Sequence, residues 1–226
     1  MGIDENKHGI PLSFLFFSAP SGNRKTNAGY NTEILVKLLH AWKTSLGSPN
    51  NVSFNVHVAI TDTDLKERGA LLTVFPNIWL LICKFHLKQS GKDQRNKVLK
   101  GTTPTHTLLK KRLRLLESHL IETTVFAQAQ LLIAKERVAI EEMLKEDAEH
   151  GVIYLAVLAH LKDYLLGYWT MSALCSSWSD FGHKVAAGRL NCAFEGVLPT
   201  TNHLESFNGL LKCKYLQCWQ NGGCRL

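Results

Sequence analysis

The stretch Phe54-Asn-Val-His-Val-Ala-Ile60, which Thr61-Asp-Thr-Asp64 closes, decides how the first part of the chain folds. Apolar residues alternate along it and many are β-branched, which predicts a strand. A short helix is expected from Leu65 to Val74. The run Ile78-Trp-Leu-Leu-Ile-Cys83 that follows is continuously apolar, as is typical of a strand covered on both faces. Two strands joined by a helix predict parallel pairing and an α/β sheet.

The residues before this stretch extend the alternation of strands and helices. An apolar, aromatic run predicts a strand over Pro11–Ser18, and a polar loop follows it to Gly29. Asn31 or Thr32 then caps a helix. Its apolar residues recur at helical spacing, and they are Ile34, Leu35, Leu38, Leu39 and Trp42. We therefore expect residues 1–83 to form the α/β part of the protein.

Charge is strongly segregated in the second part of the chain. Residues 84–114 hold ten Lys and Arg side chains and one acid, Asp93, so this segment alone exceeds the net charge of +7 of the whole chain. Residues 115–150 are acidic, with eight Asp and Glu against three Lys and Arg. Apolar residues recur here at spacings of three and four, and a further helix is expected from Val152 to Trp169, with a bend near Gly167. The chain is predicted to be almost purely helical from about residue 104 to residue 190.

Length and composition exclude several classes of protein. A chain of 226 residues with 45% hydrophobic and 20% charged residues is neither disordered nor of low complexity. No apolar stretch reaches the roughly 18 residues of a membrane span, and no secretory signal is expected because acids, Asp4 and Glu5, come first. Six scattered cysteines favour thiols over disulfides, which indicates an intracellular protein. The basic balance fits a polyanionic partner.

Asp62 is a candidate metal ligand. It follows the end of a predicted parallel strand, where open α/β sheets bind their ligands, and carboxylate oxygens suit Mg²⁺ or Mn²⁺. The alternative is that Asp62 is a turn or cap residue at the strand end. Asp64, two residues further on, more plausibly caps the helix that begins at Leu65.

Cys83 and His86 form a Cys-x-x-His pair at the end of the next strand. Both side chains can ligate zinc, but no second pair with zinc-finger spacing matches them. The alternative is structural, with a buried thiol and a histidine that bonds a nearby backbone or carboxylate group.

Glu205 lies in the stretch Thr200-Thr-Asn-His-Leu-Glu-Ser-Phe-Asn-Gly-Leu-Leu-Lys212, which opens a helix after Pro199. It is a second candidate metal ligand. It also falls in the first helical turn, where the helix dipole favours an acid in any protein.

The basic segment has two interpretations. It contacts DNA phosphates, in which case binding is strongly salt-dependent, or it pairs with the acidic segment that follows it. The candidates for DNA contacts are Lys84, Lys88, Arg95, Lys97, Lys110, Lys111, Arg112 and Arg114.

The order of these motifs resembles the transposase domain of Mutator-like elements, the MULE family. The stretches that fit best are Gly9–Phe16, Ala59–Asp64, Val74–Asn77 with Leu81–His86, and Thr200–Asn208. The resemblance implies a ribonuclease-H-like fold with a helical insertion, and an Asp-Asp-Glu triad whose two divalent metals cut and join DNA. By the same resemblance Asp62 is the second aspartate, Glu205 the glutamate, and Cys83 and His86 a pair near the site.

The chain departs from the family pattern because the first aspartate has no counterpart. We therefore expect an α/β fold made of an incomplete ribonuclease-H-like mixed sheet, without the first strand and most of the second, and a large all-helical insertion. The expected divisions are a partial core over residues 1–90, the insertion over 91–198, a returning catalytic-type helix over 199–217 and a tail over 218–226.

These observations predict an intracellular, nuclear, transposase-derived protein that has DNA as its partner and is inactive because its triad is incomplete. Exposed sheet edges would also favour self-association. Two alternatives remain open. One is a domesticated module that binds DNA or a protein without catalysis. The other is a decaying open reading frame whose product has no function.

Overall fold

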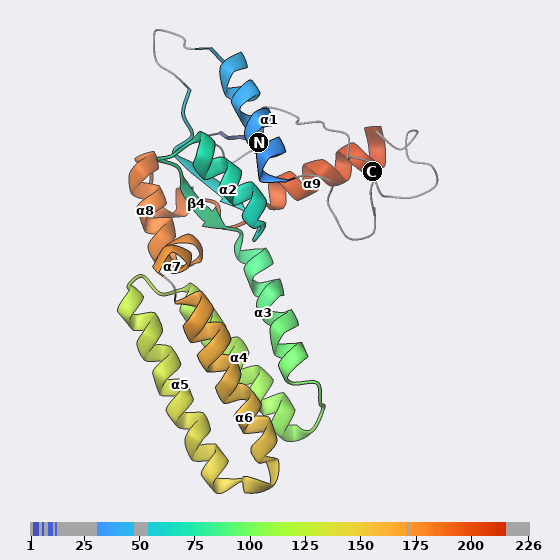
Figure 1. The fold of residues 1–226 in the computed structure, drawn as a ribbon, viewed down its shortest axis with the longest axis vertical. Helices are drawn as coiled ribbons and strands as arrows, with labels where there is room; N and C mark the ends of the chain where they lie inside the picture. The colour runs from blue at the N-terminus through green and yellow to red at the C-terminus, as the bar shows by residue number, and fades with distance from the viewer. Residues whose placement is uncertain are drawn as a thin grey trace. The chain divides into compact units, whose positions relative to one another are not determined.

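The computed structural model describes residues 2–4, 6, 9–10, 12, 31–47, 54–170 and 172–215. The chain divides into two compact units. The first unit comprises Met1–Ile78 and Thr200–Leu226, and the second comprises Trp79–Pro199. The described residues are mostly helical with a small sheet of few strands, which is consistent with the α/β class. Figure 1 labels the elements in chain order.

The first unit contains two pairs of elements that precede the second unit in the chain. Strands β1 (Gly2–Ile3) and β2 (Gly9–Ile10) pair antiparallel, with Gly2 opposite Ile10. Helix α1 (Thr32–Ser45) packs against α2 (Leu65–Val74), and β3 (Val58–Thr61) lies between them in the sequence. Apart from residue 12, the predicted strand Pro11–Ser18 lies outside the described residues.

Local signals set the ends of these helices as predicted. The side chain of Asn31 accepts a hydrogen bond from the backbone N–H of Ile34 at 2.9 Å, which confirms the cap of α1. Asp64 does the same for α2, because its Oδ1 accepts from the backbone N–H of Lys66 at 2.7 Å. The strand expected over residues 54–60 is shorter in the structure and begins at Val58.

The packing of α1 on α2 depends on aromatic side chains. The rings of Trp42, Phe54 and Phe75 meet edge to face, with centroids 5.2 to 6.5 Å apart. Phe75 is fully buried, and the ammonium group of Lys43 lies 4.9 Å from its ring centroid. The first unit returns after the second with α9 (Asn202–Leu210) and a π-helical turn, η5 (Leu211–Tyr215).

The second unit begins with a strand and is otherwise helical, which confirms the helical prediction for residues 104–190. Its longer elements are β4 (Trp79–Ile82), α3 (Lys84–Val98), α4 (Pro104–Ile121), α5 (Phe126–Glu146), α6 (Gly151–His160), the π-helix η3 (Leu161–Trp169), α7 (Ser172–Trp178) and α8 (Asp180–Leu190). Short 3-10 helices, η2 (Ala148–His150) and η4 (Phe194–Gly196), join some of them. The helix expected from Val152 to Trp169 is α-helical only to His160 and continues as η3.

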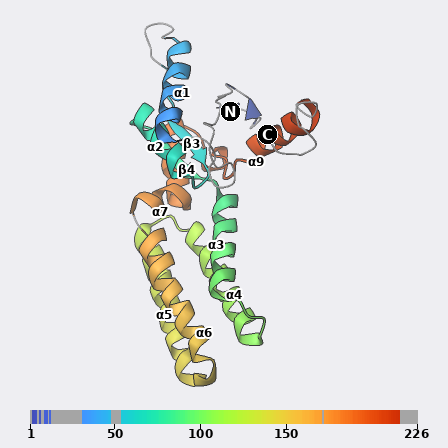
Figure 2. The ribbon, with the colours of Figure 1, turned by 45° about the vertical axis from the view of Figure 1, so that its right-hand side comes forward.

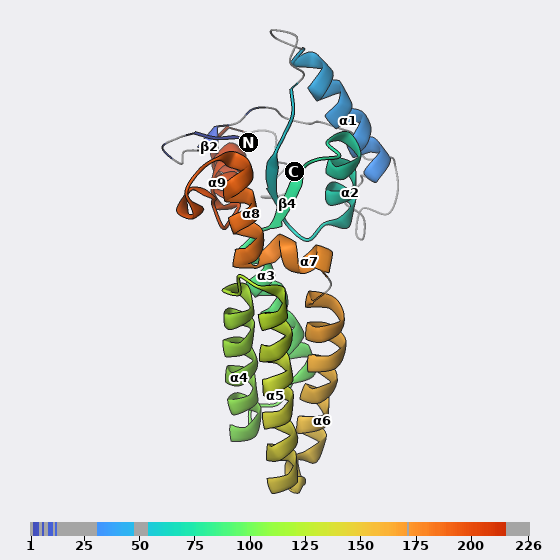
Figure 3. The same ribbon diagram turned by 90° about the vertical axis from the view of Figure 1, so that its left-hand side faces the viewer.

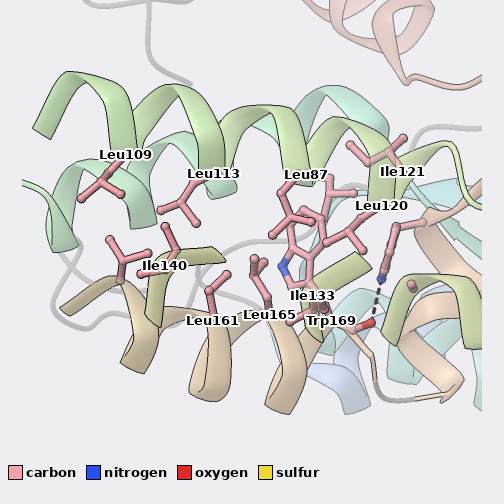
Figure 4. Close-up of a cluster of buried hydrophobic side chains, with 14 of the residues drawn as sticks. Leu87, Leu109, Leu113, Leu120, Ile121, Ile133, Ile140, Leu161, Leu165 and Trp169 are labelled. Atoms are coloured by element: carbon pink, nitrogen blue, oxygen red, sulfur yellow. Dashed lines mark hydrogen bonds between the residues drawn. The ribbon is translucent and has the colours of Figure 1, made fainter. Parts of the chain in front are cut away.

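Helices α4, α5 and α6 run side by side and enclose the main core of the second unit (Figures 2 and 3). Leucine and isoleucine side chains from α3, α4, α5 and η3 fill its centre (Figure 4). Trp169 and Trp178 close one end of the core, and the indole N–H of Trp178 donates to the backbone oxygen of Trp169 at 3.3 Å. The fully buried leucine and isoleucine side chains of this core are Leu99, Leu109, Leu113, Leu120, Ile133, Ile140, Leu161 and Leu165.

Strand β4 is held inside the second unit by α7 and α8. The indole N–H of Trp79 donates to the backbone oxygen of Gly182 at 3.0 Å, and the guanidinium group of Arg189 lies 5.0 Å from its ring centroid. Gly182 also lies directly against the backbone carbonyl group of Ser176. Helix α3, which follows β4 in the chain, therefore starts from a strand that is packed in place. Among the described residues, no helix is long and apolar enough to cross a membrane.

Candidate metal centre and nucleic-acid interface

Asp62 follows β3 directly, at the position that the sequence predicts. The side chain is half-buried, and its Oδ1 accepts a hydrogen bond from the backbone N–H of Asp64 at 2.7 Å. The preceding residue, Thr61, is buried, and its hydroxyl accepts a hydrogen bond from the guanidinium group of Arg68 at 2.9 Å. Asp62 therefore has the turn-forming role that was the alternative to metal binding.

Glu67 adds a third carboxyl group to this end of β3, and sequence reasoning missed it. The pKa of Glu67 is raised to about 7, first by burial and then by the negative charges of Asp62 and Asp64, against the opposing effect of Arg68. The one available signal was its position in the first turn of α2, three residues after the Asp64 cap. That position does not reveal burial, which depends on tertiary packing.

Glu205 lies in the first turn of α9 and is exposed. One of its carboxylate oxygens accepts a hydrogen bond from the hydroxyl group of Thr201 at 3.2 Å, and its backbone N–H donates to the backbone oxygen of Thr201 at 3.1 Å. The side chain thus bonds to the residue at the start of its own helix. This is the local role expected of an acid in a first turn.

The described residues contain no ready-made cluster of metal ligands. Carboxylate oxygens have the right chemistry for Mg²⁺ or Mn²⁺. Asp62 and Glu205 each make a hydrogen bond within their own turn, and no three Asp, Glu, His or Cys side chains in the described part of the chain converge as metal ligands. We derive no metal-dependent step from these residues.

Cys83 is the residue that precedes α3, and His86 lies in the first turn of that helix. Cys83 is fully buried, and its backbone oxygen accepts from the N–H of Leu87 at 3.0 Å. The imidazole ring of His86 is half-buried and meets the ring of Phe85 edge to face at 5.5 Å. The four described cysteines, Cys83, Cys175, Cys192 and Cys213, form no disulfides, and Cys218 and Cys224 lie outside the described residues.

Two of the predicted DNA-contacting residues form ion pairs with the acidic segment, inside the second unit. Arg95 of α3 pairs with Glu117 of α4, and both side chains are buried. Arg112 donates from Nε and a terminal nitrogen to both carboxylate oxygens of Glu136, at 2.7 and 3.0 Å. These two pairs join the basic segment to the acidic one, as the alternative interpretation predicts.

Two further candidates also bond within the second unit. Lys84 forms an ion pair with Asp180 at the start of α8. Lys110 donates to the backbone oxygen of Gly101 at 3.0 Å. The remaining candidates, Lys88, Lys97, Lys111 and Arg114, are exposed. Lys92 and Lys100, which belong to the same basic segment, are exposed as well.

The sequence analysis also missed two buried histidines of the second unit. His160 stacks on Tyr164 with ring centroids 5.0 Å apart, and burial followed by the charge of Arg95 lowers its pKa to about 4. Burial likewise lowers the pKa of His183, whose Nδ1 lies 3.2 Å from the backbone oxygen of Ser179. Both histidines are therefore neutral at pH 7.

Comparisons with known proteins place this chain in no family. No protein-family model matches it, and neither a curated protein nor a solved structure matches it.

Proposed function

We propose that this chain is a MULE-type, transposase-derived protein that binds double-stranded DNA without cutting it. The resemblance of the motif order supports the family. The binding proposal is carried by one observation, the set of exposed cations on α3 and α4 and the turn between them. We call this set the exposed cations, and it consists of Lys88, Lys92, Lys97, Lys100, Lys111 and Arg114.

The exposed cations are favourable for phosphate binding because protein carboxylates do not neutralise them. In the described part of the chain, none of the six forms an ion pair. The one acid of the segment, Asp93, accepts a hydrogen bond from the side chain of Gln89 at 2.9 Å. A phosphate backbone that replaces water around these cations would release its counterions, which drives non-specific DNA binding.

The two helices that carry most of the exposed cations are packed against each other. Lys88 and Lys92 lie one helical turn apart on α3, and Lys111 and Arg114 lie three residues apart on α4. The two helices pack against each other, and the buried pair between Arg95 and Glu117 joins them. A rigid support lowers the entropy lost when several cations contact one duplex.

Binding without cleavage is supported by the carboxylates. Two-metal cleavage of DNA requires carboxylates that hold two ions about 4 Å apart. Asp62 holds a turn through its hydrogen bond with the backbone of Asp64, and the first aspartate of the family pattern has no counterpart in the sequence.

The test is fluorescence anisotropy of a labelled 20-base-pair duplex titrated with the full chain at 50 to 200 mM salt. We compare the double variants Lys88→Glu/Lys92→Glu and Lys111→Glu/Arg114→Glu with a control, Lys162→Glu/Lys184→Glu, which changes the net charge equally at exposed positions elsewhere. Each test variant should bind at least tenfold more weakly and reduce the salt slope by about two, whereas the control should change little. Equal losses in all three, or no binding at 50 mM salt, would contradict the proposal.

The second half of the proposal has its own assay. The purified chain is incubated with the duplex and Mg²⁺ or Mn²⁺, and the strands are resolved on a denaturing gel. We expect intact strands. Robust cleavage that both Asp62→Ala and Glu205→Ala abolish would show that the protein is an active nuclease.

A further inference from the structure

The exposed side of helix α3 carries two side-chain amides along its centre. Gln89 and Asn96 are both exposed and lie seven residues, or about two helical turns, apart, so they fall on one line along the helix. The buried residues of α3, which are Leu87, Gly91 and Arg95, lie around the other side of the helix. The two amides are therefore presented to solvent and take no part in packing the core of the second unit.

Lysines flank the line of the two amides on both sides. With 3.6 residues in each turn, successive residues of an α-helix are rotated by about 100°. Lys88 therefore lies about a quarter turn to one side of the line through Gln89 and Asn96. Lys97 lies about a quarter turn to the other side, and Lys92 adds a cation on the side of Lys88; all three lysines are exposed. Hydrogen-bonding groups thus lie between two edges of positive charge.

This arrangement matches the major groove of B-form DNA. The groove is about 12 Å wide and admits an α-helix, with base edges along its floor and a phosphate backbone on each side. Helix α3 has 15 residues and is about 22 Å long, so it spans several base pairs. We infer that α3 enters the major groove as a recognition helix, with Lys88 and Lys97 on opposite phosphate backbones and Gln89 and Asn96 on base edges. This role of α3 rests on the proposed binding of double-stranded DNA.

Adenine is the base that fits these amides. The amide group of Gln or Asn donates to N7 of adenine and accepts from its N6 amino group. Oδ1 of Asp93 accepts one N–H of the Gln89 amide at 2.9 Å, which orients the group and leaves its second N–H and its oxygen for a base. The two amides are about 10 Å apart along the helix axis, so they reach base pairs about two to three positions apart. Phe85, which is 50% exposed one turn before Gln89, adds an apolar surface of the kind that contacts a thymine methyl group.

Selection by the full chain from a library of duplexes with a randomised central segment tests the sequence preference. The variant Gln89→Ala/Asn96→Ala is compared with a control, Gln128→Ala/Gln130→Ala, which removes two exposed amides from α5 instead. Wild type and control should enrich two A·T pairs, and exchange of either pair for G·C should weaken binding by about fivefold or more. The test variant should bind all duplexes alike and keep the wild-type salt slope, because it retains all of the exposed cations. Circular dichroism checks that both variants keep the helix content of the wild type.

Three further measurements identify the groove and the contact. Replacing the selected adenines by 7-deazaadenine removes the N7 acceptor and leaves the minor groove unchanged, so binding should weaken by about fivefold or more. Gln89→Glu should move the preference at one position from adenine to cytosine, because the N4 amino group of cytosine donates to a carboxylate. A double-stranded RNA of the selected sequence should bind about tenfold more weakly than the DNA, because side chains cannot read its deep, narrow major groove.

Four results would overturn the role of α3 while leaving the proposed duplex binding intact. They are duplex binding without any sequence preference, a preference that neither Gln89→Ala/Asn96→Ala nor Gln89→Glu changes, equal binding of the 7-deazaadenine duplex, and an RNA duplex bound as tightly as the DNA. The last result would indicate a surface that contacts only the backbone of either nucleic acid. No duplex binding at 50 mM salt would instead contradict the proposed function itself, so the two failures are distinguishable.

Discussion

Arg95 of α3 and Glu117 of α4 form a buried ion pair that joins two helices of the second unit. Burial lowers the pKa of Arg95, and the charge of Arg114 lowers it further. One oxygen of the Glu117 carboxylate, Oε1, has no hydrogen-bond partner among the described residues. Such a pair is costly to desolvate, and its loss from one side leaves an uncompensated charge in the core.

This relationship predicts a non-additive pair of substitutions. Glu117→Ala should lower the free energy of unfolding by about 3 to 5 kcal/mol, because Arg95 stays buried without its partner. The double variant Arg95→Met/Glu117→Leu should lose less unfolding free energy than either Arg95→Met or Glu117→Leu alone. Urea unfolding followed by circular dichroism measures all of these values. A double variant that loses the sum of the two single losses would show that the residues act independently.

Gly182 of α8 provides a matched pair of glycine substitutions. A Cβ atom at this position would overlap the backbone carbonyl group of Ser176, whereas a Cβ atom at Gly188 in the same helix meets nothing within 4 Å. We therefore expect Gly182→Ala to destabilise the chain by about 2 kcal/mol or more, because backbone atoms must shift. Gly188→Ala should stabilise it by about 0.5 to 1 kcal/mol through the lower entropy of the unfolded chain. Thermal unfolding of both variants measures the two effects. A Tm that shifts in the same direction in both would contradict this contrast.

Elements with local signals were predictable from the sequence. Asn31 and Asp64 cap the helices that they were expected to cap, because a cap depends on residues two or three positions away. The bounds of α2 follow from the cap and from the turn at Pro76-Asn77. The position of Asp62 after a strand was predictable for the same reason.

Contacts between distant residues were not predictable. Arg95 and Glu117 are 22 positions apart, so no helical spacing reveals their pairing. The charge segregation indicated that the basic and acidic segments could pair, but it could not identify which cations would be used. Likewise, the acidic character of Glu67 was visible, whereas its burial depends on how α2 packs.

The raised pKa of Glu67 should respond to removal of the neighbouring charge of Asp62. The substitution Asp62→Asn keeps a side-chain oxygen that can accept from the backbone N–H of Asp64, but it removes one of the negative charges that raise the pKa. The pKa of Glu67 should therefore fall from about 7 toward the ordinary range of a glutamate. Carbon-detected NMR titration of the Glu67 carboxyl group measures it. A pKa that does not fall would show that the charge of Asp62 does not contribute to it.

His160 predicts how the stability of the second unit depends on pH. Its Nε2 has no hydrogen-bond partner among the described residues, its ring stacks on Tyr164, and its pKa in the folded chain is about 4. The unfolded chain, with a histidine pKa near 6.5, binds the proton more tightly. The contribution of neutral His160 to the free energy of unfolding is therefore fully present above about pH 6.5. It is lost progressively as the pH falls to about 4, by about 3 kcal/mol in total. Urea unfolding at intervals between pH 7.5 and pH 4 measures this loss.

The variant His160→Phe isolates this contribution from that of the carboxylates. Phenylalanine keeps an aromatic ring against Tyr164 and cannot take up a proton, so the difference in unfolding free energy between wild type and variant should shrink or change sign as the pH falls. Arg95 reinforces the effect, because its charge also disfavours a protonated His160. Parallel stability curves for wild type and His160→Phe across this range would exclude His160 as the titrating group.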